Sequence, residues 1–502
     1  MRDIESIRKQ LDRGEFDPAD AALDEALSKT PGDEELLALR GSLRHLQRRF
    51  QAAAEDFEAA LSKQPDEANW HNALGKSLNN LQQTAAAESA FRRSLEIEPG
   101  NAETWHNLAF ALRAQGRNHQ AADAFSEALQ IKPDYVSAWH NAGLGYLAID
   151  DPDQALAAFL KAQTLAADRP QLATHIGVAL HNLGRYEDAV AAYRKALSGE
   201  PEAETQNNLA VSLQELGRDD EALAAYREAA LLAPDDQEIQ TKIANLLIGM
   251  GQPDQAIDIA RQCLARAPGH TGALAVAAVA GQEPGCKLLD SELLDFDKLI
   301  FQTELAVANH HASAEEFNRR LATHILEHPT LVYEPAGHAT RHGSHTGDLL
   351  AGEKGPVVTV EKEITAGVHR FLATLDEEKA GFLFDGMPDS WCLTMWAVVM
   401  DSQGHQLPHI HPAAWLSGVY YVQVPEEIND DDESEAGWIE FGAPPQTMNC
   451  RGEHRLRSFR PVAGTCFIFP SYFYHRPIHF ESEQQRICIA FDAIPSAKPK
   501  IR

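Results

Sequence analysis

The 502-residue sequence has few cysteines, no long hydrophobic run and little positive charge. Its six cysteines lie far apart, without a CxxC pair or the density of a disulfide-stabilised scaffold, so reduced thiols are expected. No segment approaches the roughly 18 uninterrupted apolar residues of a membrane-spanning helix, and the N-terminus has no apolar segment of signal-peptide length. We therefore expect a cytoplasmic protein without a membrane partner.

Basic residues are outnumbered: 44 Lys and Arg stand against 74 Asp and Glu, which gives a formal net charge of −30. Binding to nucleic acid or to an anionic membrane requires a basic surface that releases counterions. The composition therefore argues against nucleic acid as a partner. At this length, two or three domains are expected.

Proline recurs through the first half of the chain at intervals of 33 or 34 residues, with one double interval of 68. These prolines are Pro31, Pro65, Pro99, Pro133, Pro201, Pro234 and Pro268. In the unit 102–135, apolar residues at helical spacing precede Gly116, and a second helical pattern follows it. We expect about eight such helix–turn–helix units.

The second helix of each unit keeps a small residue and an aromatic one. Ala121, for example, allows two helices to approach closely, and Phe125 fills the gap to the next unit. The offsets resemble those of the tetratricopeptide repeat (TPR) family, with its signature of Trp, Leu-Gly, Tyr, Ala, Phe, Ala and Pro. The resemblance implies an all-α TPR solenoid with a capping helix over residues 1–285, whose concave face binds a protein or peptide.

Several units carry a His-Asn pair in their first helix, such as His106-Asn107 and His140-Asn141. An Asn amide can donate to and accept from a peptide backbone at once. The alternative, which we favour, is that these amides tie neighbouring repeats together.

The hydrophobic period changes after residue 286. Residues 287–378 have mainly helical spacing, interrupted by a polar loop at 334–348 that contains His338, His342 and His345. Beyond Gly381, short segments rich in β-branched and aromatic residues favour antiparallel β structure of the sandwich or jelly-roll type. The expected fold is therefore multidomain. An α+β domain at 286–502, with a helical part at 286–380 and a β core at 381–502, follows the solenoid.

The stretch HIHPAAWLSGVYY begins with His409 and His411, which share one face of a strand and could bind one cation. Imidazole suits Fe, Zn, Cu or Ni, and a further ligand is needed from elsewhere. His475, directly after the predicted strand GTCFIF, is the candidate. Arg486 opens the predicted strand RICIAFDAI, beside small residues that leave space for a carboxylate bound through two hydrogen bonds.

This order of elements resembles that of 2-oxoglutarate- and Fe(II)-dependent oxygenases: His-x-Asp/Glu, a Tyr-Tyr strand, a Gly-led strand, a distal His and an Arg about ten residues later. The chain has His409-x-His411, SGVYYV, GTCFIFP, His475 and Arg486. It is most similar to a bacterial and phage group with HxHPxxxLSGVYYV and FPSxxxH motifs. The resemblance covers about residues 288–502.

The resemblance implies a double-stranded β-helix (jelly-roll) core that uses Fe(II), 2-oxoglutarate as co-substrate and O2, with ascorbate as a supporting reductant. It implies His409 and His475 as iron ligands. Arg486 would pair with the distal carboxylate of 2-oxoglutarate, Tyr421 would donate to the same carboxylate, and Ser417 would line the same wall.

His411 departs from the family pattern because it stands where the carboxylate ligand is usual. It is a candidate third catalytic and metal-binding residue, and a merely supporting role stays open. Of its neighbours, Trp396 is expected in the core, and His405 and His479 are secondary candidates for substrate contact.

Three functions follow as hypotheses. The first is a dioxygenase that hydroxylates a protein or peptide recruited by the TPR array. The second is a non-catalytic TPR scaffold with a degenerate jelly-roll domain, which the missing carboxylate favours. The third is a zinc hydrolase with three histidines, which leaves Arg486 without a role.

Overall fold

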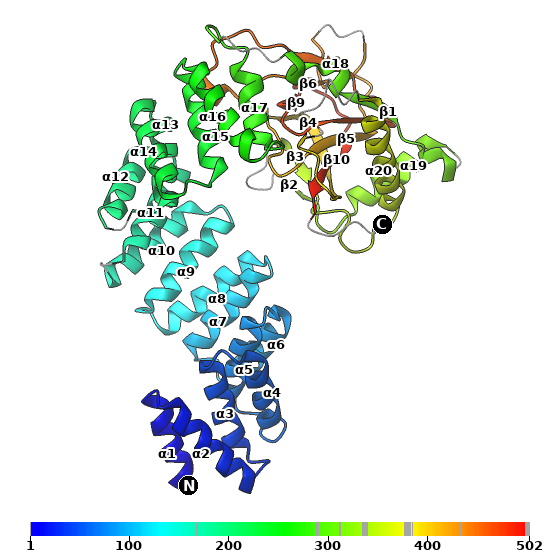
Figure 1. The fold of residues 1–502 in the computed structure, drawn as a ribbon. Coiled ribbons are helices and arrows are strands. Elements are labelled where there is room, and N and C mark those ends of the chain that lie inside the picture. The colour runs from blue at the N-terminus through cyan, green and yellow to red at the C-terminus, as the bar shows by residue number, and fades with distance from the viewer. Residues whose placement is uncertain are drawn as a thin grey trace. The chain divides into compact units, whose positions relative to one another are not determined.

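The computed structural model describes residues 2–166, 169–199, 201–286, 291–310, 313–333, 340–375, 383, 385–430 and 434–496. The chain divides into two compact units, Met1–Gly217 and Arg218–Arg502 (Figure 1). Residue His338 of the predicted polar loop lies outside the described residues. Within them, every helix is too short or too polar to cross a membrane.

The first unit is built from consecutive antiparallel helices. They are α1 Arg2–Asp12, α2 Phe16–Lys29, α3 Glu34–Leu46, α4 Phe50–Leu61, α5 Ala68–Asn80, α6 Thr84–Ile97, α7 Ala102–Ala114, α8 Asn118–Ile131, α9 Val136–Ala148, α10 Pro152–Leu165, α11 Pro170–Asn182, α12 Tyr186–Leu197 and α13 Ala203–Glu215. The helix–turn–helix prediction is confirmed, and α7 and α8 fall on either side of Gly116 as expected.

The turn inside each repeat places one residue in the left-handed region, which ends the first helix and reverses the chain. These residues are Gly14, Arg48, Gln82, Gly116, Asp150, Gly184, Gly217 and Gly251, with φ between 57° and 75°. They recur with the period of the prolines, so one backbone geometry is repeated along the sequence.

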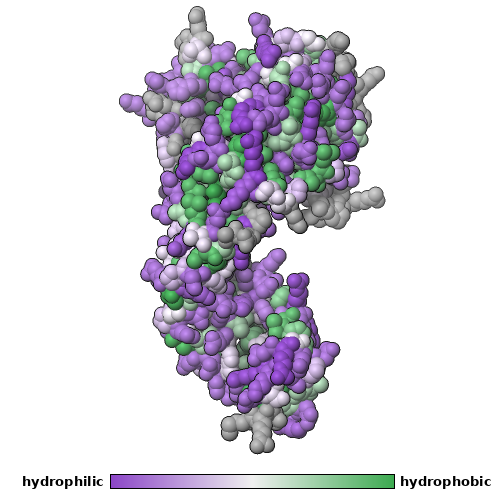
Figure 2. Space-filling view, turned by 90° about the vertical axis from the view of Figure 1, so that its left-hand side faces the viewer, coloured by the Kyte–Doolittle hydropathy of each residue, from purple (hydrophilic) through white to green (hydrophobic). Residues whose placement is uncertain are grey.

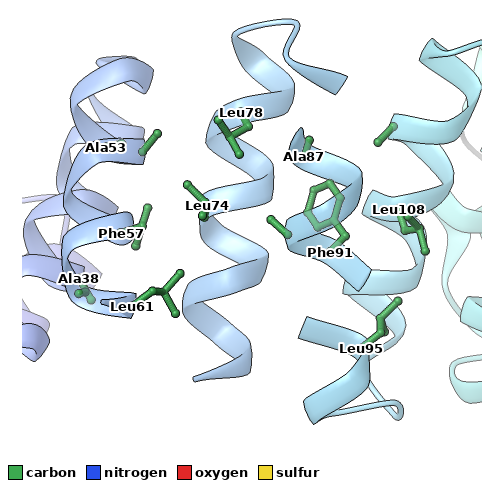
Figure 3. Packing of buried hydrophobic residues seen from close by; sticks show 14 of the residues in the cluster. Ala38, Ala53, Phe57, Leu61, Leu74, Leu78, Ala87, Phe91, Leu95 and Leu108 are labelled. Atoms are coloured by element: carbon green, nitrogen blue, oxygen red, sulfur yellow. The ribbon is translucent and has the colours of Figure 1, made fainter. Parts of the chain in front are cut away.

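The repeat aromatics pack within their own repeat as well as against the next one, which adds to the expectation that they fill the gap between units. A Cβ added at Gly75 would lie 2.5 Å from the Phe91 ring, and one at Gly143 would lie 2.5 Å from Phe159. Phe125 also borders Gly145 of the following repeat. Figure 3 shows the buried alanine, leucine and phenylalanine side chains of successive helices meeting in one continuous core.

The polar pairs of the first helices connect neighbouring repeats, as we favoured. Asn107 Nδ2 donates to Asn72 Oδ1 at 3.0 Å, and Asn141 Nδ2 donates to His106 Nε2 at 3.0 Å. His140 and His175 continue the series, with ring nitrogens 3.2 Å apart. These groups therefore fix the angle between repeats.

The second unit begins with solenoid helices and continues into the β domain. Its helices are α14 Asp219–Leu232, α15 Gln237–Gly249, α16 Pro253–Arg266, α17 Thr271–Ala280, α18 Phe296–Leu299, α19 Ala314–Leu326 and α20 Val357–Thr374, with 3-10 turns η1 Ser291–Leu294, η2 Val307–His310 and η3 Gln446–Met448. Helix α17 lies in the segment where a capping helix is expected. Helices α19 and α20 lie beside the sheet (Figure 1) and share one apolar core with it.

Two antiparallel sheets form the β domain, as the jelly-roll prediction requires. The larger has the order β1-β8-β5-β10-β4-β3-β2, and the smaller has the order β7-β6-β9. Their strands are β1 Phe301–Glu304, β2 Val332–Tyr333, β3 Thr340–His345, β4 Trp391–Gln406, β5 Leu416–Gln423, β6 Ile439–Phe441, β7 Arg457–Phe459, β8 Thr465–Pro470, β9 His475–Pro477 and β10 Arg486–Pro495. Phe441 and Phe469 meet edge to face at 4.8 Å where the sheets pack.

Three short strands, β1, β2 and β3, lie in the part of the domain that was expected to be helical. Strand β1 lies in a segment expected to be helical, and pairing with β8 overrides its local periodicity. Strand β3 lies in the expected polar loop and pairs with β4. Its residues TRHGSH lack apolar alternation, so the sequence carried no strand signal.

Hydrophilic side chains predominate on the face of the molecule in Figure 2, with smaller hydrophobic areas between them. This agrees with the surplus of acidic residues in the sequence.

Candidate active site

A cavity of about 390 Å³ lies between the two sheets. Strands β4, β5 and β10 line one wall, and β6 and β9 contribute to the other. Five residues singled out from the sequence face it: His409, His411, Tyr421, His475 and Arg486. The structure therefore brings the proposed metal ligands and the proposed carboxylate-binding pair to one cavity.

The three histidines converge closely enough for one metal ion. One ring nitrogen from each lies within 4.8 Å of the other two. His409 and His475 exchange backbone hydrogen bonds of 3.2 and 3.1 Å, which holds the two segments together. The amide of His411 donates to Ser471 O at 3.2 Å, so its backbone is also fixed.

Hydrogen bonds select the tautomer of two of these rings. His409 Nδ1 donates to Leu407 O at 2.9 Å, and His475 Nδ1 donates to Phe473 O at 3.0 Å. Because a carbonyl oxygen only accepts, both Nδ1 atoms carry hydrogen and both Nε2 atoms keep a lone pair. Metal-binding histidines are oriented in this way.

Burial keeps these two imidazoles neutral at neutral pH. It lowers the pKa of His409 to about 4, with a further contribution from nearby His411. It also lowers the pKa of His475 well below its ordinary value, and the neighbouring histidines add to this effect. A neutral imidazole is the form that binds a metal ion.

The third ring has a different partner. His411 Nδ1 lies 2.6 Å from Asp492 Oδ1, and the same oxygen accepts from Ser417 Oγ at 2.6 Å. Ser471 Oγ lies 2.8 Å from Ser417 Oγ and donates to it. With Nδ1 bound to a carboxylate, His411 also directs its Nε2 to the cavity.

Ser417 was expected to line the same wall as Tyr421, and it lies on the same strand, but its hydroxyl donates to Asp492. Ser417 and Tyr421 lie on β5. Their partners on β10 are Asp492 and Cys488, respectively. Four residues along a strand span about 13 Å, so Ser417 belongs to the histidine end of the cavity. Asp492 itself was missed, although it continues the alternation of Arg486, Cys488 and Ala490.

Arg486 closes the other end of the cavity. It is only 3% exposed, its Nη2 donates to Tyr421 Oη at 3.1 Å, and its Nε has no hydrogen-bond partner. Within the described residues, no carboxylate forms an ion pair with it. A buried, unpaired guanidinium is costly, so the site is suited to an anionic ligand.

Tyr421 is placed to help bind that ligand. Its hydroxyl oxygen accepts from Arg486, which leaves its hydrogen for another acceptor. Burial raises the pKa of Tyr421 to about 12, so the hydroxyl stays a donor at neutral pH.

Other predictions near the cavity had mixed outcomes. Trp396 is not a core residue: it lines the cavity and stacks on His411 with ring centroids 5.7 Å apart. Strand alternation places it on the face shared with Ala490. His345, expected in a polar loop, lies on β3 and also lines the cavity. The rings of His405 and His479 lie 5.8 Å apart, outside the lining residues.

Comparison with protein families agrees with both halves of this description. A family model described as "Putative 2OG-Fe(II) oxygenase" matches residues 394–492, which include the three histidines, Tyr421, Arg486 and Asp492. Tetratricopeptide repeat models match residues 47–102, 81–142, 136–169, 170–202, 203–236 and 237–270. The chain carries TPR repeats and a 2OG-Fe(II) oxygenase family domain.

Several solved structures are similar to part of the chain, and two of the three described here are TPR proteins by their titles. The C-terminal part of a TPR protein from Cytophaga hutchinsonii is 13% identical, with a TM-score of 0.40, over 47% of this chain and 97% of that one. A thermophilic TPR protein from Thermus thermophilus is 26% identical, with a TM-score of 0.30, over 36% and 99%. The pilF protein of Pseudomonas aeruginosa is 22% identical, with a TM-score of 0.36, over 41% and 95%. No curated protein matches the sequence.

Helix α17 connects the last TPR repeat to the oxygenase domain at both of its ends. Near its start, Thr271 Oγ1 donates to Ala414 O at 2.8 Å, in the turn that follows His411. Just beyond its end, the Glu283 carboxylate accepts from the amides of Arg451 and Gly452 at 2.9 and 3.2 Å. The last solenoid helix therefore supports two loops of the oxygenase domain.

Glu283, Cys450 and His454 form a second group of possible metal ligands. Here Gln282 Nε2 donates to His454 Nδ1 at 3.4 Å, so His454 Nε2 carries hydrogen and donates to Glu283 Oε1 at 3.0 Å. Burial, with nearby Glu283, raises the pKa of Cys450 to about 12, which keeps the thiol protonated. In this cluster the potential ligand atoms bind one another through hydrogen bonds, whereas the cavity histidines keep their Nε2 lone pairs for a metal ion.

Proposed function

We propose that this protein is a 2-oxoglutarate- and Fe(II)-dependent dioxygenase that hydroxylates a protein or peptide substrate recruited by the concave face of its TPR array. One observation carries the proposal: three imidazole lone pairs and a buried, unpaired arginine face the same cavity. The oxygenase family match supports the same chemistry.

The donor set fits Fe(II). His409, His411 and His475 offer three nitrogen atoms from one side, and imidazole is a common ligand of non-haem iron. No other protein ligand is needed on the cavity side, which leaves room for small molecules to bind the metal. When bound, the iron and 2-oxoglutarate together supply the activation of O2 and the oxidation of a C–H bond.

The other end of the cavity fits a dicarboxylate. Arg486 presents donors in a planar fork, and Tyr421 presents one hydroxyl hydrogen beside it. A carboxylate there would satisfy Arg486 Nε and neutralise its charge. Cys488, between Arg486 and Ala490 on the same face of β10, is small enough to leave space above it.

The chain positions the reactants and limits the access of water. Val398, Val419, Ile439 and Phe469 give the cavity apolar walls. Low polarity strengthens the contact between Arg486 and a carboxylate. Trp396 and His345 line the cavity from β4 and β3, and we assign them to the substrate side of the site.

A macromolecular substrate is favoured by the repeats, since TPR arrays bind proteins or peptides in general. The inter-repeat amides of Asn107 and Asn141 are already engaged with neighbouring repeats. Recruitment would therefore use other side chains of the first helices.

The test is succinate formation by the full-length protein with Fe(II), ascorbate and 2-oxoglutarate, together with mass spectrometry for addition of one oxygen atom to peptides from a lysate. Iron-dependent succinate should be lost in His475→Ala and strongly reduced in Arg486→Ala. His479→Ala is the control, because His479 is exposed and outside the cavity lining. If the iron-loaded protein neither binds nor turns over 2-oxoglutarate, the non-catalytic scaffold function replaces this proposal.

A further inference from the structure

We infer that Asp492 is a positioning residue that supplies, through His411, the negative charge which the family pattern places on the metal ligand itself. The inference rests on the proposed function, because it concerns the same metal site. It explains how a histidine can stand where a carboxylate is usual.

The contact is short and leaves little choice of geometry. His411 Nδ1 and Asp492 Oδ1 are 2.6 Å apart, and Asp492 is only 8% exposed. A charge-assisted hydrogen bond of this length is among the stronger ones in proteins. It turns the His411 ring so that Nε2 points to the other two histidines.

The carboxylate has no competing cation. Among the described residues, no Lys or Arg forms an ion pair with Asp492. Its other partner is the neutral hydroxyl of Ser417, which Ser471 holds in turn. The negative charge of Asp492 is therefore directed mainly at His411.

His411 is the only one of the three histidines with such a partner among the described contacts. His409 and His475 donate to neutral main-chain carbonyls two residues before them. An anionic acceptor raises the basicity of an imidazole ligand more than a neutral one does. The metal with its ligands and Asp492 then carries the same net charge as a site with two histidines and one directly bound carboxylate.

The β-sheet explains why this carboxylate lies where it does. Asp492 shares a face of β10 with Arg486, Cys488 and Ala490, and it lies opposite Ser417 on β5. One strand thus supplies a charged residue at each end of the cavity. Arg486 is placed to bind the carboxylate, and Asp492 is placed to orient the metal ligand His411.

The inference predicts that metal binding is strongest when only one of positions 411 and 492 carries a carboxylate. Asp492→Asn keeps the size of the side chain and an acceptor oxygen but removes the charge. His411→Asp alone brings two carboxylates into one buried region, where like charges repel. The double variant His411→Asp/Asp492→Asn again has a single carboxylate, now available to the metal.

The experiment measures binding of Co(II) and of Fe(II), each alone, to the full-length protein, and records the visible Co(II) spectrum. Asp492→Asn should weaken binding by about 10- to 100-fold and shift the spectrum. His411→Asp should bind worse than the double variant, which should recover affinity. Asp401→Asn is the control, because the Asp401 carboxylate accepts from Gln485 Nε2 at 2.8 Å and lies outside the cavity lining. Thermal unfolding of the metal-free proteins verifies that each variant is folded.

Wild-type affinity and spectrum in Asp492→Asn would overturn the inference and leave the proposed function intact. So would a double variant that binds no better than His411→Asp. Asp492-dependent metal binding without succinate formation would support the inference and contradict the dioxygenase activity. Absence of metal binding by the wild-type protein would overturn both.

Discussion

Thr271, the first residue of α17, donates a 2.8 Å hydrogen bond to the carbonyl oxygen of Ala414. The amide of Ala414 in turn donates to His411 O at 3.1 Å. A side chain of the solenoid is thus two hydrogen bonds away from a candidate metal ligand. This contact makes the solenoid end part of the support of the site.

Thr271→Val should therefore reduce both stability and metal affinity. Valine has the same shape but leaves the buried carbonyl of Ala414 without its donor, which costs about 1–3 kcal/mol. Denaturant unfolding and Co(II) titration measure the two effects. Thr241→Val is the control, because the Thr241 hydroxyl bonds only within α15. Equal losses in the two variants would show that the contact to Ala414 has no special role.

Arg486→Lys should raise the KM for 2-oxoglutarate by at least about 10-fold, because lysine keeps the charge but loses the fork geometry. Tyr421→Phe removes one donor to a carboxylate and should raise KM by about 10- to 100-fold, with a smaller effect on kcat. Succinate kinetics and calorimetric 2-oxoglutarate binding measure both. A fall in kcat with unchanged KM would place the carboxylate elsewhere.

Two glycines of α9 should respond in opposite ways to alanine. A Cβ at Gly143 would lie 2.5 Å from the Phe159 ring, so Gly143→Ala should destabilise the array by about 1–3 kcal/mol. A Cβ at Gly145 would lie 3.9 Å from Phe125, and Gly145→Ala should stabilise the helix by up to about 1 kcal/mol. Denaturant unfolding compares the pair. Similar effects from both substitutions would contradict the packing described for the repeats.

Acid should lower the stability of the helices around His140. Burial, together with nearby His175, Arg169 and Arg113, lowers the pKa of His140 from 6.5 to about 4. Between these values the unfolded chain binds more protons, so stability falls as pH drops below about 6.5 and levels off near 4.

Hydrogen exchange of the α9–α11 amides at about pH 7 and pH 5, corrected for intrinsic rates, measures this loss. His140→Asn should reduce the pH dependence, because asparagine does not titrate. An unchanged pH dependence in this variant would assign the effect to other groups.

The repeats could be predicted from sequence because their contacts are local. Ala121 and Phe125 recur at a fixed period, and the same small-residue and aromatic contacts form in every repeat. The β domain depends on pairings between distant segments. Strands that pair at a polar edge, such as β3, therefore carry little local signal.

The site was predicted in part for a similar reason. His409, His475 and Arg486 lie in recognisable motifs, and all three face the cavity. Trp396 was placed in the core because an aromatic in a strand is usually buried, and only the register shows which face it occupies. Asp492 could have been found by extending the alternation of β10 by two residues.

The second unit, Arg218–Arg502, contains both the candidate site and contacts that support it, which matters when the protein is shortened. Thr271 and Glu283, which hold two loops of the oxygenase domain, lie in the solenoid part of this unit. A chain cut at residue 286 would lose both supports. A version of the oxygenase domain that is expressed alone should therefore begin before Thr271, so that α17 and Glu283 are both kept.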